Sequence, residues 1–189
     1  MCGRFYIEPN ANDYREIFEM LQKKLKGSET FDLLKTSGEI FPGDTAVVQV
    51  GNLRYAAMKW GFSGFDNKLI INARMETAEE KPLFKQAIKE HRCLILASGY
   101  YEWHKEGNVR TKYRFYHPDS PLALAGFYRQ EKTTESARFV ILTKAADDDI
   151  KEIHDRMPVI IPSDLQATWL EKGLSLADIK NAELRNQAV

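Results

Sequence analysis

Apolar residues recur at helical spacing in two segments of the chain. In residues 12–26 they fall on one face at intervals of three and four, at Tyr14, Ile17, Phe18, Leu21 and Leu25. Gly27 follows directly and is a typical C-terminal stop, so we predict an amphipathic helix there. A second helix is predicted to begin near Pro82, which suits a first-turn position, and to end before Cys93. Its apolar side consists of Leu83, Phe84, Ala87 and Ile88.

Other apolar segments are short, rich in β-branched and aromatic residues, and separated by Gly, Pro, Asn or Ser, which is typical of strands. They are TAVVQV (45–50), LRYAAMKW (53–60), CLILA (93–97), KYRFY (112–116), LALAGFY (122–128) and RFVILT (138–143). Because these strands outnumber the helices and do not alternate with them regularly, the pattern favours an α+β fold over a doubly wound sheet. We predict one domain over residues 1–189, with a curved, mostly antiparallel, barrel-like sheet flanked by short helices. Two of the short helices are expected in residues 147–154 and 164–171, the second capped by Ser163.

The charge balance limits the kinds of binding surface that the chain can offer. Lys plus Arg and Asp plus Glu both number 27, so the strongly basic character of many nucleic-acid-binding proteins is absent and any DNA surface must be local. One candidate is residues 104–114, where Lys105, Arg110, Lys112 and Arg114 accompany a single acid, Glu106. No apolar run approaches the length of a membrane span and the N-terminus lacks signal-peptide regions. We therefore expect a cytoplasmic protein, associated with the nucleoid if its source is prokaryotic.

The chain opens with MCGRF, which places a thiol at position 2. Methionine aminopeptidase removes an initiator Met that precedes a small residue, so the mature chain is expected to begin with Cys2. Its α-amine then has a pKa of about 7.7 to 8 and its thiol one of about 8.5, so both are partly nucleophilic near neutrality. Such a 1,2-aminothiol condenses with an aldehyde to a Schiff base, which the thiol closes into a thiazolidine ring. The plainer alternative is a disordered chain start. The other cysteine, Cys93, is expected to be a small buried hydrophobe.

Three polar residues beside apolar segments could orient a substrate or transfer protons. They are Asn72 in INARMET, Glu102 in SGYYEWH and His154 ahead of the sequence DRMP. A carboxyl in a partly apolar pocket has a raised pKa and can act as an acid near neutrality, and a histidine near a helix end can change charge at physiological pH. Taken alone, each has a simpler reading: Glu102 as an outward residue of an alternating strand, Asn72 as a turn or cap, and His154 as a solvated side chain.

Four further residues could contact a nucleic-acid strand. Arg4 and Arg74 could hold phosphates, while Trp60 in KWGF and Pro42 in FPGD could stack on bases or wedge between them. The simpler readings are surface arginines, a core tryptophan and a Pro-Gly turn. The sequence has no metal-ligand spacing, and side chains can supply the nucleophile, the proton carriers and the phosphate contacts, so no metal or organic cofactor is expected.

Taken together, these segments resemble the SOS response-associated peptidase (SRAP) family over nearly the whole chain. The matching motifs, in order, are MCGRF (1–5), FPGD (41–44), MKWGF (58–62), INARMET (71–77), HRCLILASGYYEW (91–103), LALAGFY (122–128), ILTKAA (141–146) and HDRMPVII (154–161). Two stretches depart from the family pattern. Residues 63–68 read SGFDNK where many relatives carry a proline and a second tryptophan, and GYYEW stands for GFYEW, which keeps an aromatic ring.

The resemblance implies self-attachment to DNA. In this reaction Cys2, exposed by removal of Met1, captures the aldehyde of an abasic site in single-stranded DNA as a thiazolidine. By the same resemblance, Asn72 orients the reacting groups and Glu102 assists sugar ring opening and Schiff-base formation. His154 would handle protons at the sugar, including in strand cleavage by β-elimination or in reversal of the link.

The resemblance also implies a binding surface and a partner. Arg4 and Arg74 match positions that hold the phosphates flanking the lesion, and Thr143 matches one near the active centre that contacts DNA. The expected partner is single-stranded DNA with an abasic site, bound by a monomer away from membranes. Two alternatives stay open: a cysteine peptidase with Cys2 as nucleophile and His154 as base, and a noncatalytic binder of single-stranded DNA or of a partner protein.

Overall fold

The computed structural model describes residues 2–8, 12–51, 54–131, 137–172, 174–179 and 183–189. Its α-helices are α1 (Asn12–Leu25), α2 (Glu29–Leu33), α3 (Pro82–Glu90), α4 (Asp148–Lys151) and α5 (Gln166–Leu170), and its 3₁₀ turns are η1 (Phe65–Asn67), η2 (Ser163–Leu165) and η3 (Leu176–Asp178). The strands are β1 (Phe5–Ile7), β2 (Gly38–Ile40), β3 (Thr45–Gly51), β4 (Arg54–Trp60), β5 (Phe62–Ser63), β6 (Leu69–Ile70), β7 (Asn72–Arg74), β8 (Arg92–Ala97), β9 (Gly99–Glu106), β10 (Val109–Tyr116), β11 (Leu122–Gln130), β12 (Ala137–Ala145), β13 (Arg156–Pro158) and β14 (Arg185–Ala188).

The strands form a five-stranded sheet, a seven-stranded sheet and a separate β5–β6 pair. The five-stranded sheet has the order β14-β10-β9-β1-β2, and its pairs are antiparallel. In the larger sheet β11 pairs with both β8 and β12, so that β11, β8, β3, β4 and β12 close into a ring. The pairs of β12 with β4 and with β7 are parallel. The predicted α+β class with a mostly antiparallel, barrel-like core is confirmed.

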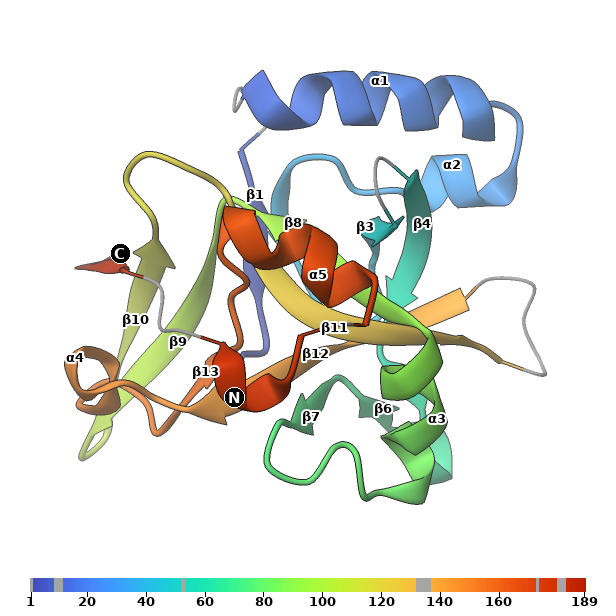
Figure 1. The fold of residues 1–189 in the computed structure, drawn as a ribbon. Coiled ribbons are helices and arrows are strands. Elements are labelled where there is room, and N and C mark those ends of the chain that lie inside the picture. The colour runs from blue at the N-terminus through green and yellow to red at the C-terminus, as the bar shows by residue number, and fades with distance from the viewer. Residues whose placement is uncertain (1, 9–11, 52–53, 132–136, 173, 180–182) are drawn as a thin grey trace.

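Two helices cover opposite ends of this core. Figure 1 shows α1 lying across the end of the sheets beside β3 and β4, with α3 at the other end near β6 and β7. Tyr14, Phe18 and Leu21 of α1 are buried, and the Tyr14 hydroxyl donates to the carbonyl oxygen of Ala97 at 3.0 Å. Pro82 opens α3 in its first turn, as predicted. The burial of one face therefore holds each helix against the sheets.

Two details of the predicted helices are wrong. Leu83 was expected on the buried side of α3, but it is exposed, and the helix packs through Phe84, Ala87 and Ile88. Ser163 does not cap a helix, because it begins the 3₁₀ turn η2, and α5 follows that turn without a side-chain cap. The helix expected in residues 147–154 is the short α4.

Aromatic side chains fill the middle of the core. The indole of Trp60 is fully buried, with its ring centroid 5.2 Å from that of Phe5 and 6.3 Å from that of Phe139. Cys93 is buried in β8, as predicted. Among the described residues, no helix is both long and apolar enough to span a membrane.

Candidate functional site

Four segments that are distant in the sequence meet at one place. Cys2 lies just before β1, Asn72 opens β7, Glu102 is in β9, and His154 lies between α4 and β13. The side-chain amide Nδ2 of Asn72 donates to the carbonyl oxygen of Cys2 at 2.8 Å. The imidazole Nε2 of His154 lies 3.7 Å from Oε2 of Glu102, whose charge also acts on the Cys2 thiol. The structure thus brings together the four residues that the sequence singled out for chemistry.

Strand pairing explains how these segments meet. β1 pairs with β9, and the Tyr101 N–H donates to the carbonyl oxygen of Arg4 at 2.9 Å, which carries the chain start toward Glu102. β12 lies between the other two contributors. It pairs with β7 through Ile141 opposite Asn72 and with β13 through Thr143 opposite Pro158. A central strand therefore holds the Asn72 and His154 segments on its two sides.

The Cys2 thiol is enclosed by protein. Its side chain is fully buried, and its Sγ lies 4.0 Å from the carbonyl oxygen of Arg4, the outer limit of a weak S–H hydrogen bond. Burial raises the pKa of this thiol, and the negative charge of Glu102 raises it further. The thiol is therefore protonated at neutral pH, so any reaction through its sulfur requires a nearby proton acceptor.

Glu102 has the properties of such a proton carrier. The alternating pattern of its strand also allows an outward side chain, but Glu102 points inward and is only 3% exposed. Alternation along β9 puts its side chain on the same face as that of Tyr100, which stacks on Phe115 at 4.9 Å between ring centroids. Burial raises the pKa of Glu102 to about 7. At neutral pH the carboxyl is therefore divided between its acid and base forms, as general acid–base catalysis requires.

His154 faces Glu102 from the turn after α4. Its Nδ1 accepts the backbone N–H of Arg156 at 3.0 Å, so a neutral imidazole carries its proton on Nε2, the atom nearest Glu102. Burial lowers the pKa of His154. If the ring takes up a second proton, Nδ1 can donate to the Asp155 carboxylate, whose Oδ1 lies 3.0 Å away. The Glu102–His154 pair can therefore hold and pass protons near neutral pH.

Asn72 and Tyr100 each have a buried polar atom with no hydrogen-bond partner among the described residues. The amide group of Asn72 donates through Nδ2, but its buried Oδ1 accepts no hydrogen bond from the described residues. The same holds for the fully buried Tyr100 hydroxyl, whose pKa is raised well above its ordinary value by burial and by the charges of Cys2 and Glu102. Unpaired buried polar atoms are rare and often mark functional sites. Tyr100 received no role from the sequence, although its two-residue spacing from Glu102 predicts a shared face.

Two expected DNA contacts need correction. Trp60 cannot stack on a base in this conformation, because its ring is fully buried and its indole Nε1 donates to the carbonyl oxygen of Ile71 at 3.0 Å. Thr143 is also fully buried, and its hydroxyl donates to the carbonyl oxygen of Ala73 at 3.3 Å. Both residues support the elements that carry the site, and neither presents a surface to a strand.

The remaining expected contacts lie nearer the surface. Arg74 is exposed two residues after Asn72 and forms no ion pair with any residue that the structure describes. Pro42 is half-buried in the turn after β2, beside the exposed ring of Phe41. Arg4 is half-buried, with its Nη1 2.9 Å from Oε2 of Glu39. Arg74 and Pro42 are therefore accessible to a ligand, whereas Arg4 is already paired with the carboxylate of Glu39.

Arg156 and Glu76 form a further contact that the sequence did not predict. The two guanidinium Nη atoms of Arg156 lie 2.6 and 2.9 Å from the carboxylate oxygens of Glu76, and Nη2 also donates to the carbonyl oxygen of Thr143 at 2.7 Å. This bidentate pair lowers the pKa of Glu76 to about 2. Because the partners are 80 positions apart, no local pattern could have predicted the pair. It ties the segment after β7 to β13, and so fixes Asn72 and His154 relative to each other.

No group of three or more metal-ligating side chains occurs within the described part of the chain. Two hollows of about 650 and 670 Å³ are lined mainly by residues of α1, α2, β4 and the segments around β11 and α5. The lining of neither hollow includes Cys2, Asn72, Glu102 or His154. The candidate site is therefore separate from these two hollows and consists of side chains packed around Cys2.

Comparison with known proteins gives a consistent assignment. A family model described as SOS response associated peptidase (SRAP) matches residues 1–187. The chain is 28% identical to the abasic site processing protein YedK of Escherichia coli (strain K12), over 93% of this chain and 82% of that protein. It is 32% identical to the abasic site processing protein YoaM of Bacillus subtilis (strain 168), over 90% of this chain and 79% of that protein. A crystal structure of a Bacteroides thetaiotaomicron protein has the same fold, with a TM-score of 0.80 and 21% identity, and the match covers 100% of this chain and 92% of the other. Since the family model spans nearly its full length, the chain belongs to the SOS response associated peptidase family.

Proposed function

We propose that this chain processes abasic sites in single-stranded DNA by linking itself covalently to them through Cys2. The names of its relatives support abasic-site processing in general. The observation that carries the specific proposal is the site around Cys2: a buried carboxyl with a pKa of about 7, 3.7 Å from His154 and close enough to influence the Cys2 thiol. An amine and a thiol on one residue, next to a proton carrier, suit the capture of an aldehyde.

The reaction begins once Met1 has been removed. The α-amine of Cys2 adds to the aldehyde carbon of the ring-opened sugar, and loss of water gives a Schiff base. The thiol then adds across the carbon–nitrogen double bond and closes a thiazolidine ring. One water is released in all, and no oxidant or reductant is needed.

The proton transfers can be assigned to groups near Cys2. The acid form of Glu102 donates a proton to the sugar ring oxygen during opening, or to the hydroxyl that leaves as water. The resulting carboxylate then takes the proton of the Cys2 thiol, which burial keeps protonated until that moment. His154 exchanges protons with Glu102 and with the sugar, in strand cleavage or in reversal of the link. Asn72 holds the carbonyl group of Cys2, and its Oδ1, which has no partner among the described residues, can accept a hydrogen bond from the amine.

The DNA strand is held by cations beside this site. Arg74 is exposed two residues from Asn72, and Arg4 is two residues from Cys2, so both can reach phosphates that flank the bound sugar. Pro42 and the exposed ring of Phe41 offer an apolar surface beside Arg4, whose guanidinium carbon lies 4.1 Å from the Phe41 ring centroid. The balanced net charge is compatible with this role, since a covalent bond lessens the need for equilibrium affinity.

The geometry favours aldehyde capture over a cysteine peptidase. A thiol–imidazole pair requires the sulfur and a ring nitrogen within hydrogen-bond reach. Within the described residues, the polar contact of Cys2 Sγ is to the Arg4 carbonyl oxygen, while Nε2 of His154 faces Glu102. The two reactions also differ in the group they need. Acetylation of the Cys2 amine blocks thiazolidine formation but leaves thiol-based proteolysis largely intact.

The test uses an oligonucleotide with one abasic site, incubated with protein whose intact mass shows that Met1 is absent. The proposal predicts an SDS-resistant band that is missing with the Cys2→Ala variant and with a tetrahydrofuran analogue that has no aldehyde. A band that persists in Cys2→Ala, or no band at all with the processed protein, refutes the proposal. A noncatalytic DNA binder instead predicts salt-reversible binding that is indifferent to the aldehyde.

A further inference from the structure

The outward face of the five-stranded sheet carries aromatic and charged side chains in alternation. Directly paired residues of neighbouring strands project to the same face of a sheet. Lys112 pairs with Trp103 and Arg114 with Tyr101 across β9 and β10, and Glu39 pairs with Tyr6 across β1 and β2. The rings of Tyr6 and Tyr101 lie 5.1 Å apart and connect the two halves of this face. The face is opposite to the one that carries Glu102, so it lies beside the chemical site but outside it.

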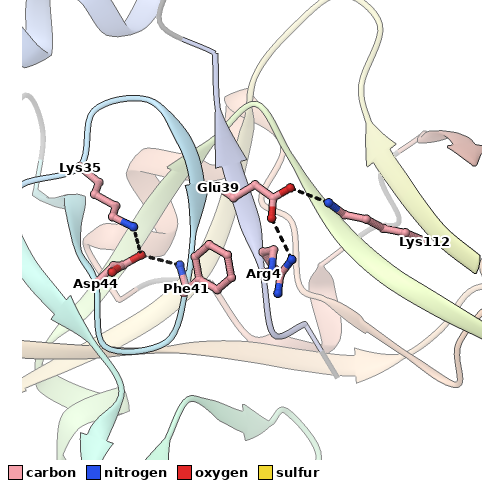
Figure 2. A network of polar contacts seen from close by, with 6 residues as sticks. All are labelled: Arg4, Lys35, Glu39, Phe41, Asp44 and Lys112. Atoms are coloured by element: carbon pink, nitrogen blue, oxygen red, sulfur yellow. Dashed lines mark hydrogen bonds and ion pairs between the residues drawn. The ribbon is translucent and has the colours of Figure 1, made fainter. Parts of the chain in front are cut away.

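Two cations on this face converge on one carboxylate. Figure 2 shows Glu39 between Arg4 and Lys112, with one carboxylate oxygen directed to each. Nη1 of Arg4 lies 2.9 Å from Oε2, and Nζ of Lys112 lies 2.5 Å from Oε1. Burial alone would raise the pKa of Glu39, but its bonds to Lys112 and Arg4 outweigh burial and lower it. Glu39 is therefore an anion held by two positive groups, one just before β1 and the other in β10.

Aromatic rings hold the same two cations independently of Glu39. The guanidinium of Arg4 lies 4.1 Å from the ring centroid of Phe41 and 5.0 Å from that of Trp103, and the ammonium of Lys112 lies 3.8 Å from that of Tyr101. Figure 2 shows the Phe41 ring next to the Arg4 side chain. Cation–π contacts of this kind orient a positive group without neutralising it. The two cations can thus keep their positions if the carboxylate leaves.

The Glu39 carboxylate resembles a phosphodiester group in its negative charge and in its pair of oxygens. Both anions present two oxygens at similar spacing, and arginine and lysine bind either one. The side chains of Arg4, Lys112 and Glu39 are 27%, 24% and 31% exposed, so their ion pairs are partly solvated and weak. A strand that offers a phosphate at this point can replace the carboxylate at small cost, and exposed Phe41 then lies beside the adjacent base.

We propose that Arg4 and Lys112 form a single subsite for one phosphate of the DNA strand, and that the Glu39 carboxylate occupies this subsite until the strand binds. The inference rests on the proposed function, because it takes DNA as the ligand. It gives Lys112 a defined role within the basic stretch of residues 104–114, and it makes Glu39 an internal competitor of DNA.

The experiment measures equilibrium binding of a single-stranded oligonucleotide with a central tetrahydrofuran residue, by fluorescence anisotropy at several salt concentrations. Glu39→Gln is expected to tighten binding by about two- to fivefold, the size of a partly exposed ion pair. Lys112→Gln is expected to weaken binding and to reduce the slope of log K against log salt by about 0.7, the loss of one phosphate contact on a single strand. In the double variant the effect of Glu39→Gln should shrink, since both residues act on one subsite.

A matched control is Glu19→Gln, which removes the same charge from an exposed ion pair with Arg15 on α1. It should leave binding closer to that of the parent protein than Glu39→Gln does. The inference is overturned if Lys112→Gln leaves affinity and salt slope unchanged, or if Glu39→Gln weakens binding.

A parallel assay with a true abasic site separates the phosphate subsite from the proposed covalent chemistry. If no SDS-resistant band forms while the Glu39 and Lys112 effects appear, the proposed chemistry fails and the phosphate subsite stands. If the band forms and these effects are absent, the proposed chemistry stands and the phosphate subsite fails.

Discussion

Replacement of Glu102 by glutamine should stabilise the protein at alkaline pH and inactivate it. The folded protein raises the pKa of this carboxyl from an ordinary 4.5 to about 7, mainly through burial, so folding favours the protonated form. The stability associated with this shift is fully present below pH 4.5 and is lost as the pH rises through about 7. Glutamine cannot ionise, so the variant avoids that loss.

The size of the effect follows from the same pKa difference. With an unfolded value of 4.5 and a folded value of about 7, ionisation of Glu102 lowers the free energy of unfolding by about 1 kcal/mol at pH 5 and about 3 kcal/mol at pH 8. The advantage of Glu102→Gln over the parent should therefore grow by about 2 kcal/mol between these two pH values.

Urea unfolding of both proteins at pH 5 and pH 8 measures this difference directly. A slope of roughly 1–3 kcal/mol/M converts it into a shift of the midpoint of about one molar. The control is Glu106→Gln, which makes the same replacement at an exposed glutamate of the same strand. An equal stability difference at both pH values, or a variant less stable than the parent at pH 8, would refute the assignment of a buried, proton-sharing carboxyl.

The Glu102→Gln variant also loses general acid–base catalysis, so it should form the covalent band more slowly by about 10²-fold or more.

Three further substitutions test other parts of the site. Tyr100→Phe removes a buried hydroxyl with no hydrogen-bond partner among the described residues, and it should raise the free energy of unfolding by about 1 kcal/mol in urea titrations; a loss of stability would show that the hydroxyl is paired. Trp60→Leu should destabilise the protein by about 2–4 kcal/mol while leaving affinity for intact single-stranded DNA unchanged, since the ring is a core residue; weaker binding by the folded variant would contradict that role. Asn72→Ala removes the donor to the Cys2 carbonyl oxygen and should slow adduct formation on the order of a hundredfold without changing DNA affinity, and an unchanged rate would exclude a positioning role.

The sequence predicted those elements whose pattern is long and regular. The face of α1 built from Tyr14, Phe18 and Leu21 and the apolar runs of β8 and β11 leave few alternatives, because burial of such surfaces is the main source of stability. The strands β1, β7 and β13 could not be predicted in this way. Each is three residues long, and two of them contain polar side chains, so they become strands only because β9 and β12 pair with them.

The side-chain directions within the site were similarly beyond local reasoning. Alternation along β9 predicts that Glu102 and Tyr101 point to opposite faces, but it does not say which face is buried. That choice is made by partners elsewhere, since Tyr100 stacks on Phe115 of β10 and carries its face into the core. Trp60 could be either a core residue or a base-stacking residue until closure of the strand ring buried it. The roles assigned to Cys2, Asn72, Glu102 and His154 in the reaction stay predictions.

The complete enclosure of the Cys2 side chain has a consequence for how active protein is made. An aminopeptidase must take the end of a chain into its own catalytic pocket, and the segments that act on Cys2 include those of Asn72 and Glu102, which leave the ribosome well after it. Trimming is therefore expected on the nascent chain, before the sheet assembles. Protein that is overproduced faster than its Met1 is removed should fold into a form that cannot link to DNA. Added aminopeptidase should activate that form only after it has been unfolded, which makes the history of a preparation as important for its activity as its sequence.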